Sequence, residues 1–230
     1  MSLNIIILAA GNGKRMHSTL PKVMHKVGGK TMLEHVLISA KKLNPKSINV
    51  VVNSKIEDIK INFENYKINW FNQEEQKGTA DAVNTALPNL KKEDDVLVLY
   101  ADTPLIDYKL LERFINYMPE SDAKVLTVTL ENPFGYGRII REQAEKEIIS
   151  RIVEETETND TQKNIKECNT GIVFSSVGTL KNLISKVENN NSKKEFYLTD
   201  IVSIAKDKGL VVAPLLVKDS DSLLGVNDKC

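Results

Sequence analysis

Two glycines and two cations follow the first apolar run of the chain, and together they could bind an anion. The stretch LAAGNGKRM contains Gly11, Gly13 and Arg15, and Lys22 follows shortly after it in LPK. Glycines let backbone N–H groups approach a ligand closely, and the two side chains add fixed positive charge. Pro21 restricts the backbone beside Lys22, which suits a cation that must point in one direction. The spacing predicts a phosphate-binding loop, and a strand-to-helix turn with two solvated cations is the alternative.

A carboxylate stands at the end of another apolar run, DVLVLYAD (95–102). Asp102 closes this run, and Pro104 is expected to stop strand pairing there. Mg²⁺ at nucleotide sites takes one or two carboxylates together with phosphate oxygens and water. Asp102 is therefore a candidate magnesium ligand. An Asx turn or the N-cap of a helix starting near Tyr108 is the alternative role, and Asp107 could cap that helix equally well.

Two familiar phosphate-loop motifs do not fit the glycine-rich stretch. A Walker A loop needs a glycine five positions before its Gly-Lys-Ser/Thr, but Met24 stands at that position before GKT (29–31). A Rossmann dinucleotide fingerprint needs a glycine where Met16 stands. The second apolar run, ending in VVNSK, also offers no acidic residue for a ribose. The sequence therefore disfavours a dinucleotide-dependent dehydrogenase.

Short apolar runs alternate with amphipathic stretches along nearly the whole chain, and these elements must position the candidate groups. Strands are expected at 4–10, 48–53, 68–71, 95–102, 124–130, 170–176 and 210–217. Helices are expected at 31–43, 79–87, 108–118, 177–187 and 197–209. This alternation predicts an α/β protein with a Rossmann-like, mostly parallel sheet flanked by helices. Ligands bind at the carboxyl ends of the strands in such sheets, which is where the glycine loop and Asp102 fall.

The stretch 131–168 interrupts this alternation. It is charged and rich in turn residues, and it has few apolar residues with which to build a core. We expect residues 1–230 to form a single domain, with a small lobe inserted at about 131–168.

The overall composition excludes several classes of partner. Lys plus Arg and Asp plus Glu both number 31, so no net charge attracts nucleic acid or anionic lipid. The first apolar run is too short to cross a bilayer and lacks a basic leader. Two cysteines, Cys168 and Cys230, do not make a disulfide framework. The sequence predicts a cytoplasmic protein with no nucleic-acid or membrane partner.

Longer motifs, in the same order along the chain, resemble the N-acetylglucosamine-1-phosphate uridylyltransferases, a family of sugar nucleotidyltransferases. The matching stretches are LPKVMHKVGGKTMLEHV, NQEEQKGTADAV, LYADTPLI, NPFGYGRIIR, IVEE, ECNTGI, EFYLTDIV and LLGVND. Ala101 and Phe134 depart from the family pattern, which has glycine and a small residue at these positions. Neither departure removes a charged group. The resemblance implies the nucleotide-diphospho-sugar transferase fold, with a mixed sheet and a sugar-binding lobe.

The resemblance also implies which residues bind the nucleotide. Catalytic roles fall to Arg15 and Lys22, which would hold the triphosphate, and to Asp102. Backbone groups that would line the nucleotide belong to Leu8, Ala9, Ala10 and Gly11. Further nucleotide contacts would come from Tyr100, Ala101 and Asp102. The uracil would be read by Gln73, Gly78 and Thr79; Gln73 offers both a donor and an acceptor, as a uracil edge requires.

The amino sugar and the metal ion have their own implied ligands. Gly137, Glu154 and Asn169 would bind the sugar. Asp102 and Asn227 would together bind Mg²⁺. Judged by residue chemistry alone, Gln73 could be an ordinary strand-end glutamine, Glu154 a solvated acid, Asn169 a turn residue and Asn227 an exposed chain-end residue.

The implied reaction transfers UMP from UTP to N-acetyl-α-D-glucosamine 1-phosphate and releases pyrophosphate. Its product would be UDP-N-acetylglucosamine, a precursor of the bacterial cell envelope. The alternatives are the same chemistry on another sugar phosphate or nucleotide, and a non-catalytic nucleotide-sugar sensor. Many relatives carry a C-terminal left-handed β-helix that acetylates glucosamine 1-phosphate. The sequence given shows no hexapeptide repeats of that kind, so neither acetyl transfer nor the trimer that such a domain imposes is expected of these residues.

Overall fold

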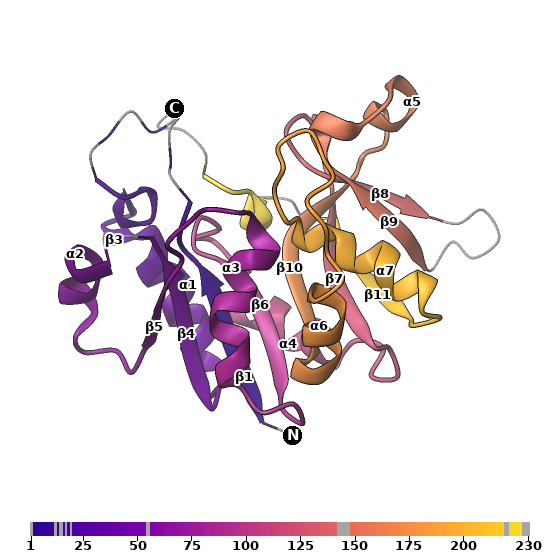
Figure 1. Ribbon diagram of the computed structural model, residues 1–230. Helices are drawn as coiled ribbons and strands as arrows, with labels where there is room; N and C mark the ends of the chain where they lie inside the picture. The colour runs from indigo at the N-terminus through magenta and orange to yellow at the C-terminus, as the bar shows by residue number, and fades with distance from the viewer. Residues whose placement is uncertain are drawn as a thin grey trace.

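The apolar runs form one mixed sheet in the computed structural model of the chain (Figure 1). The structure describes residues 2–11, 13, 16, 18, 20–53, 56–141, 148–218 and 221–226. Within these residues the main strands are β1 (Leu3–Leu8), β4 (Ser47–Val52), β5 (Asn69–Asn72), β6 (Asp95–Tyr100), β7 (Ala123–Thr129), β10 (Glu167–Ser176) and β11 (Val212–Val217). All seven expected strands are present, with ends that differ by a few residues.

The strand order explains where a ligand can bind. The order is β11-β7-β10-β6-β1-β4-β5, in which β6, β1, β4 and β5 are mutually parallel. Strand β10 runs antiparallel to both β6 and β7, while β11 is parallel to β7. The sheet is therefore mixed but mostly parallel, as expected. The carboxyl ends of β1 and β6 are neighbours, because Leu8 pairs with Tyr100.

Helices cover both faces of the sheet (Figure 1). One core cluster packs α1 (Met32–Lys42), α2 (Ile56–Lys60) and α4 (Tyr108–Asn116) against one face. The other packs α3 (Thr79–Ala86), α6 (Val177–Ile184) and α7 (Ile201–Asp207) against the opposite face. Strands covered on both faces read as continuous apolar runs, and Ile5, Ile6 and Ile7 of β1 are all fully buried. Among the described residues, no helix is long and apolar enough to cross a membrane.

Local signals in the sequence set the helix boundaries. The Thr31 hydroxyl accepts a hydrogen bond from the Glu34 N–H at 3.1 Å and so caps α1. The expected helix at 197–209 differs in detail, because it begins as a 3₁₀ turn, Leu198–Asp200, before α7. Gly209 follows α7 with a φ of 69°, the left-handed conformation expected of a glycine just past a helix.

The end of β6 corrects one expectation. The strand ends at Tyr100, before Pro104, because the chain turns there and the Thr103 hydroxyl donates to the Tyr100 carbonyl at 2.9 Å. Pro104 is therefore not what stops the pairing. Asp107 occupies the N-cap position of α4 but makes no side-chain capping bond. Asp102 lies in the turn, and its side chain bonds elsewhere.

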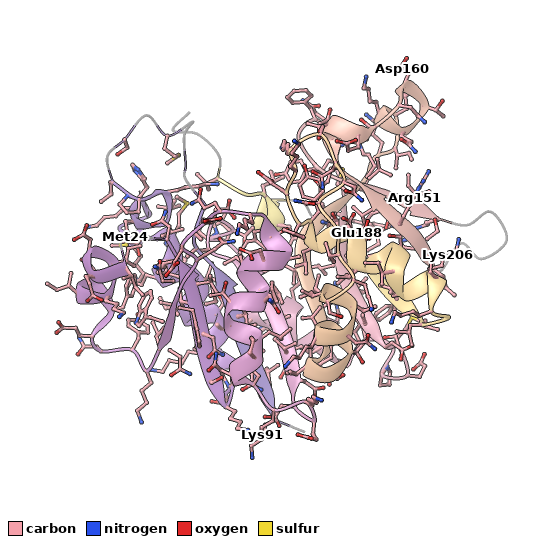
Figure 2. The ribbon with its side chains drawn as sticks, viewed as in Figure 1. Met24, Lys91, Arg151, Asp160, Glu188 and Lys206 are labelled. Atoms are coloured by element: carbon pink, nitrogen blue, oxygen red, sulfur yellow. The ribbon has the colours of Figure 1, made fainter. Side chains whose placement is uncertain are left out.

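The stretch 131–168 leaves the main sheet and returns to it. It contains β8 (Arg138–Arg141), β9 (Ile149–Val153) and α5 (Asp160–Lys163). Strands β8 and β9 pair with each other, and β8 joins the sheet where Arg138 pairs with Cys168 of β10. Figure 2 shows Asp160 at the outer end of this projection, on the opposite half of the molecule from Met24. That this stretch is a sugar-binding insertion within a single domain stays a prediction.

Candidate active site

A cavity of about 450 Å³ opens at the carboxyl ends of β1 and β6. Its lining includes Leu8, Ala9, Ala10, Gly11, Gly13, Lys22, Val23, Gln73, Gln76, Gly78, Thr79, Ala82, Tyr100, Asp102 and Glu195. The cavity thus brings together most of the residues that the sequence assigned to the nucleotide. Its position is where parallel sheets bind ligands, because loops diverge from the strand ends there.

Lys22 and Asp102 meet in this cavity as an ion pair. Lys22 Nζ lies 2.5 Å from Asp102 Oδ2, and the two side chains are 11% and 25% exposed. Lys22 begins a short 3₁₀ turn, Lys22–Met24, in which Val23 and Met24 are buried. This packing fixes the backbone from which the ammonium projects. The pair places one cation and one carboxylate side by side, which is the combination needed to hold phosphates and a divalent cation.

The two glycines of the loop have different structural roles. No atom of the described residues lies within 4 Å of a Cβ added at Gly11, so this backbone faces open space that a ligand can approach. A Cβ added at Gly13 would lie 2.7 Å from the Cβ of Lys22, and the φ of Gly13 is +55°. Gly13 is therefore needed to let the Lys22 side chain pass, which the sequence did not reveal. The predicted approach of the loop to a ligand fits Gly11 better.

Four polar or glycine residues line the side of the cavity between β5 and α3. Gln73 follows β5 directly, and its backbone N–H donates to the Val52 carbonyl at 2.8 Å. Gly78 precedes α3, and the Thr79 hydroxyl accepts from the Leu198 N–H at 2.9 Å. Gln76, which the sequence analysis missed, donates through Nε2 to the Ala10 carbonyl. This bond joins the glycine loop to the opposite wall of the cavity.

Tyr100 separates this cavity from a much smaller one beneath the projecting lobe. Its side chain lines both. Burial raises the pKa of Tyr100, and the negative charge of Glu154 adds to the effect. A Cβ added at Gly171, whose φ is +84°, would lie 2.5 Å from the Tyr100 ring. Only glycine therefore fits under this ring without moving it, and the ring stays a neutral, fixed wall.

Of the three predicted sugar ligands, Asn169 lines the smaller cavity with Tyr100, and Gly137 and Glu154 are hydrogen-bonded to residues of that lining. The Asn169 N–H donates to the Gly137 carbonyl at 2.9 Å. The Asn169 side-chain oxygen accepts from the Gly171 N–H at 3.0 Å. Asn169 lies within β10, where the register with β7 shifts after it, so its alternative role as a turn residue is wrong. Glu154 Oε1 accepts from the Thr199 hydroxyl at 2.8 Å. Glu154 is therefore not a solvated acid.

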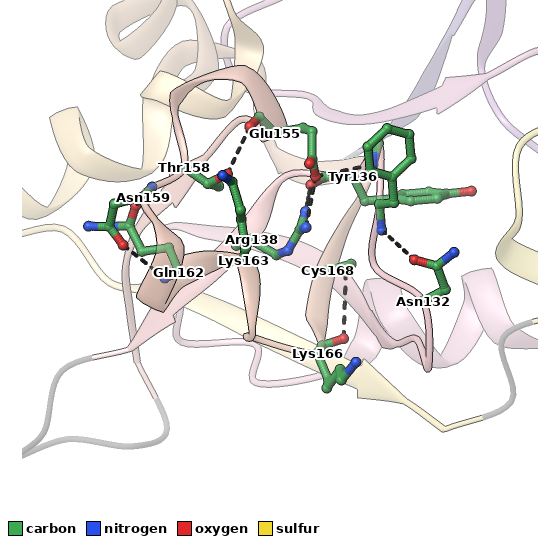
Figure 3. A network of polar contacts seen from close by, with 12 residues as sticks. Asn132, Tyr136, Arg138, Glu155, Thr158, Asn159, Gln162, Lys163, Lys166 and Cys168 are labelled. Carbon is green, nitrogen blue, oxygen red and sulfur yellow. Dashed lines mark hydrogen bonds and ion pairs between the residues drawn. The ribbon is translucent and has the colours of Figure 1, made fainter.

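A buried ion pair ties the segments that carry these sugar-side residues together. Arg138 of β8 is 2% exposed, and its guanidinium lies 2.7 Å from Glu155 Oε2. The same carboxylate oxygen accepts from the Gly135 N–H at 3.1 Å. Figure 3 shows Arg138 pointing at Glu155, with Tyr136 beside them. Because Arg138 adjoins Gly137 and Glu155 adjoins Glu154, this pair fixes the spacing between two candidate sugar ligands.

Two carboxyl groups on the sugar side are perturbed by their surroundings. Burial raises the pKa of Glu154, although the hydrogen bond from Thr199 partly opposes this. Burial, followed by the negative charge of Glu154, raises the pKa of Asp200 to about 6. Each carboxyl thus keeps its proton to a higher pH in the folded protein than a solvent-exposed carboxyl would.

We expect Asp200→Asn to stabilise the protein more at about pH 8 than at about pH 5. Folding raises the pKa of Asp200 from 3.8 to about 6, so stability that is present at acid pH is lost as the pH rises through this window. An asparagine has no such loss. Thermal unfolding at the two pH values measures the difference. Glu112→Gln, at an exposed position of α4, is the control, and an equal gain in both variants would contradict the expectation.

Three of the residues predicted to contact the nucleotide or the metal are not found in the described lining of the cavity: Arg15, Asn227 and Ala101. Arg15 and Asn227 lie outside the described residues. Val226, which precedes Asn227, donates its N–H to the Asp102 carbonyl at 2.8 Å. The Ala101 side chain is fully buried and does not line the cavity, although its N–H binds the Leu8 carbonyl at 3.0 Å. Besides Gln76, two further residues at the site were not predicted from the sequence, Glu195 and Thr199, both of which lie within the motif EFYLTDIV.

The strand order and the position of the cavity define a nucleotide-diphospho-sugar transferase fold. A solved UDP-glucose pyrophosphorylase in complex with UDP-glucose superposes with a TM-score of 0.75 at 17% identity, covering 95% of this chain and 91% of that one. The inositol-1-phosphate CTP transferase of T. maritima superposes with a TM-score of 0.70 at 18% identity, covering 93% and 84%. At such low identity these structures establish the fold alone.

The chain belongs to the MobA-like NTP transferase domain family, whose model matches residues 5–161. It is 44% identical over 229 residues to the bifunctional protein GlmU of Pseudomonas putida, covering 100% of this chain and 50% of that protein. It is 40% identical over 227 residues to the bifunctional protein GlmU of Buchnera aphidicola, covering 99% and 49%. The chain thus spans about half the length of these curated relatives.

Proposed function

We propose that this chain transfers UMP from UTP to N-acetyl-α-D-glucosamine 1-phosphate, giving UDP-N-acetylglucosamine and pyrophosphate. The observation that carries this proposal is the cavity in which the Lys22–Asp102 pair faces Gln73 and Gly78. Such a cavity offers charge for phosphates at one end and amide groups for a base at the other. The identity to the GlmU proteins and the fold shared with a UDP-glucose pyrophosphorylase support the same reaction class.

The chemistry requires positioning and charge rather than a general base. An oxygen of the sugar phosphate, already an anion, attacks the α-phosphorus of UTP. A new O–P bond forms while the bond to pyrophosphate breaks, and the leaving oxygen takes the electron pair. Lys22 would hold the phosphates in line and offset their charge, together with Arg15 as the sequence implies. Backbone N–H groups near Gly11 can approach the same phosphates, because open space lies over that glycine.

The donor set around Asp102 fits Mg²⁺. The carboxylate faces the cavity at the end of β6, beside a cation that also attracts phosphate. In the part of the chain that the structure describes, no three His, Cys, Asp or Glu side chains cluster as a protein metal cage would require. Mg²⁺ needs no such cage, because substrate phosphates and water complete its shell. Asp102, with Asn227 as the sequence implies, would hold the ion, which when bound would neutralise charge on the reacting phosphates.

The sugar would lie beside Tyr100, because the hollow behind that ring, about 10 Å³, is too small to hold it. Glu154, Gly137 and Asn169 are candidates for contacts with its hydroxyl and acetamido groups. Glu154 is fixed by Thr199, and Asn169 by its bond to the Gly171 N–H where the register of β10 shifts. The Asn169 side-chain oxygen already accepts this bond, and its amide nitrogen would donate to an acetamido carbonyl.

The test is pyrophosphate release with Mg²⁺ and UTP for three acceptors: N-acetylglucosamine 1-phosphate, glucosamine 1-phosphate and glucose 1-phosphate. We expect kcat/KM to favour the N-acetylated acceptor by at least about tenfold, because a fixed donor rejects ligands that leave it unpaired. A preference for glucose 1-phosphate would keep the reaction class and overturn the sugar assignment. Tight UTP binding without release from any acceptor would indicate a nucleotide-sugar sensor instead.

A further inference from the structure

The side chain of Gln73 is held from behind by an acidic residue of α3. Gln73 Nε2 donates to Asp81 Oδ2 at 2.7 Å and to the Gly78 carbonyl at 3.1 Å. Gln73 itself is 5% exposed and lines the nucleotide cavity. Asp81 does not line that cavity. It lines a separate hollow on the other side of Gln73, together with Glu74, Glu75 and Lys77.

The chemistry of these two partners determines which way the Gln73 amide faces. A carboxylate and a backbone carbonyl both accept hydrogen bonds and cannot donate them. The NH₂ end of the amide must therefore face Asp81 and the Gly78 carbonyl, and the reversed amide would place oxygen against oxygen. Both N–H groups of Gln73 are used in this way. Among the described residues none donates to Gln73 Oε1, which is left as the group that can meet a ligand.

Asp81 is well placed to hold this orientation. It lies in the first turn of α3, and the Thr85 hydroxyl donates to its backbone carbonyl at 3.0 Å. The helix therefore fixes its position, and the positive end of the helix dipole attracts its carboxylate. A charged acceptor also binds an amide N–H more strongly than a neutral one does.

We propose that Asp81 is a positioning residue that sets the base selectivity of the cavity. By holding the Gln73 amide with its oxygen toward the ligand, Asp81 makes the site an acceptor for a pyrimidine N3–H. Uracil presents that N–H, whereas the N3 of cytosine is itself an acceptor and would oppose Gln73 Oε1. This inference rests on the proposed function, in which Gln73 contacts the base.

The test compares UTP with CTP as nucleotide donors in four variants of the full chain. Gln73→Ala removes the amide that is proposed to contact the base. Asp81→Leu removes the acceptor at similar size, whereas Asp81→Asn keeps one acceptor oxygen. Glu34→Leu removes an acid from the first turn of α1 and serves as the matched control for general effects of a lost helix-terminal charge. The readouts are the ratio of kcat/KM for UTP to that for CTP, and the affinity for each nucleotide by titration calorimetry.

We expect Asp81→Leu to lower the UTP-to-CTP ratio by about tenfold, since one misdirected hydrogen bond has about that effect on discrimination. Asp81→Asn should retain most of the ratio, and Glu34→Leu all of it. A ratio unchanged in Asp81→Leu, while Gln73→Ala abolishes it, would overturn the role of Asp81 and leave the proposed function intact. A native chain that binds and uses neither nucleotide would instead overturn the proposed function, and the inference with it.

Discussion

Replacing Asp102 with alanine is expected to lower kcat by about a thousandfold, the upper range for loss of one preorganised electrostatic group. The carboxylate is the acidic side chain that lines the cavity next to Lys22, at the end of β6. Without it, the divalent cation loses a protein ligand at the phosphates. The measurement is steady-state pyrophosphate release across a titration of Mg²⁺, in which the variant should also need more metal to reach its maximal rate.

A second readout separates this role from a structural one. Asp102 is an ion-pair partner of Lys22. Without this carboxylate, less of the positive charge of the ammonium is offset, so Lys22 attracts phosphates more strongly. Metal-free UTP binding should therefore be no weaker in Asp102→Ala than in the native chain. Asp107→Ala is the matched control, because Asp107 is exposed in the same loop and makes no capping bond. Equal losses of activity in the two variants would contradict the assigned role of Asp102.

Gly78→Ala is expected to destabilise the protein by about 3 kcal/mol and to raise the KM for UTP. The φ of Gly78 is +119°, and an added Cβ would lie 2.4 Å from the Phe196 carbonyl oxygen and 2.6 Å from its nitrogen. These are backbone atoms, which cannot rotate away. The Phe196 backbone is also hydrogen-bonded on both sides of Gly78: its N–H donates to the Lys77 carbonyl, and its carbonyl accepts from the Ala80 N–H. The substitution must therefore open the cavity wall between α3 and the segment that carries Glu195.

Gly209→Ala provides the control for the backbone conformation alone. Gly209 also has a positive φ, +69°, but a Cβ there would meet nothing within 4 Å. It should cost only about 1–2 kcal/mol, the penalty of the left-handed conformation, and should leave the KM for UTP unchanged. Chemical denaturation measures both free energies of unfolding. Equal losses of stability in the two variants would contradict the prediction, because they would show that the Phe196 backbone moves aside at no cost in free energy.

The sequence predicted that the glycine-rich loop and Asp102 would lie at the same edge of the sheet, because that arrangement follows from sheet topology. Lys22 and Asp102 are 80 residues apart in the chain, yet both follow strands whose carboxyl ends meet at one edge of a parallel sheet. Helix α1 was likewise predictable, because its capping threonine and its apolar spacing are local signals. The spacing of Met32, Leu33, Val36 and Leu37 places them on one helix face, and all four are fully buried.

Contacts that follow neither from sheet topology nor from local helix signals could not be predicted from the sequence. Nothing in the residue types indicates that Gly13 packs on the Lys22 side chain or that Asp81 bonds Gln73, because both depend on how two backbones approach one another. The proline suggested that β6 would continue to Asp102. The strand instead ends at Tyr100, in a turn where the Thr103 hydroxyl donates to the Tyr100 carbonyl. The role of Thr199 could not be predicted, because its hydroxyl donates to Glu154, which is distant in the sequence.

The most direct test of the proposed reaction is to identify its products. The chain would be incubated with Mg²⁺, UTP and N-acetylglucosamine 1-phosphate, and followed by ³¹P nuclear magnetic resonance. We predict that the coupled signals of a sugar nucleotide diphosphate appear together with pyrophosphate, in equal amounts, while the signals of both substrates decline. Formation of UDP and inorganic phosphate, or a spectrum that stays unchanged although UTP is bound, would contradict uridylyl transfer.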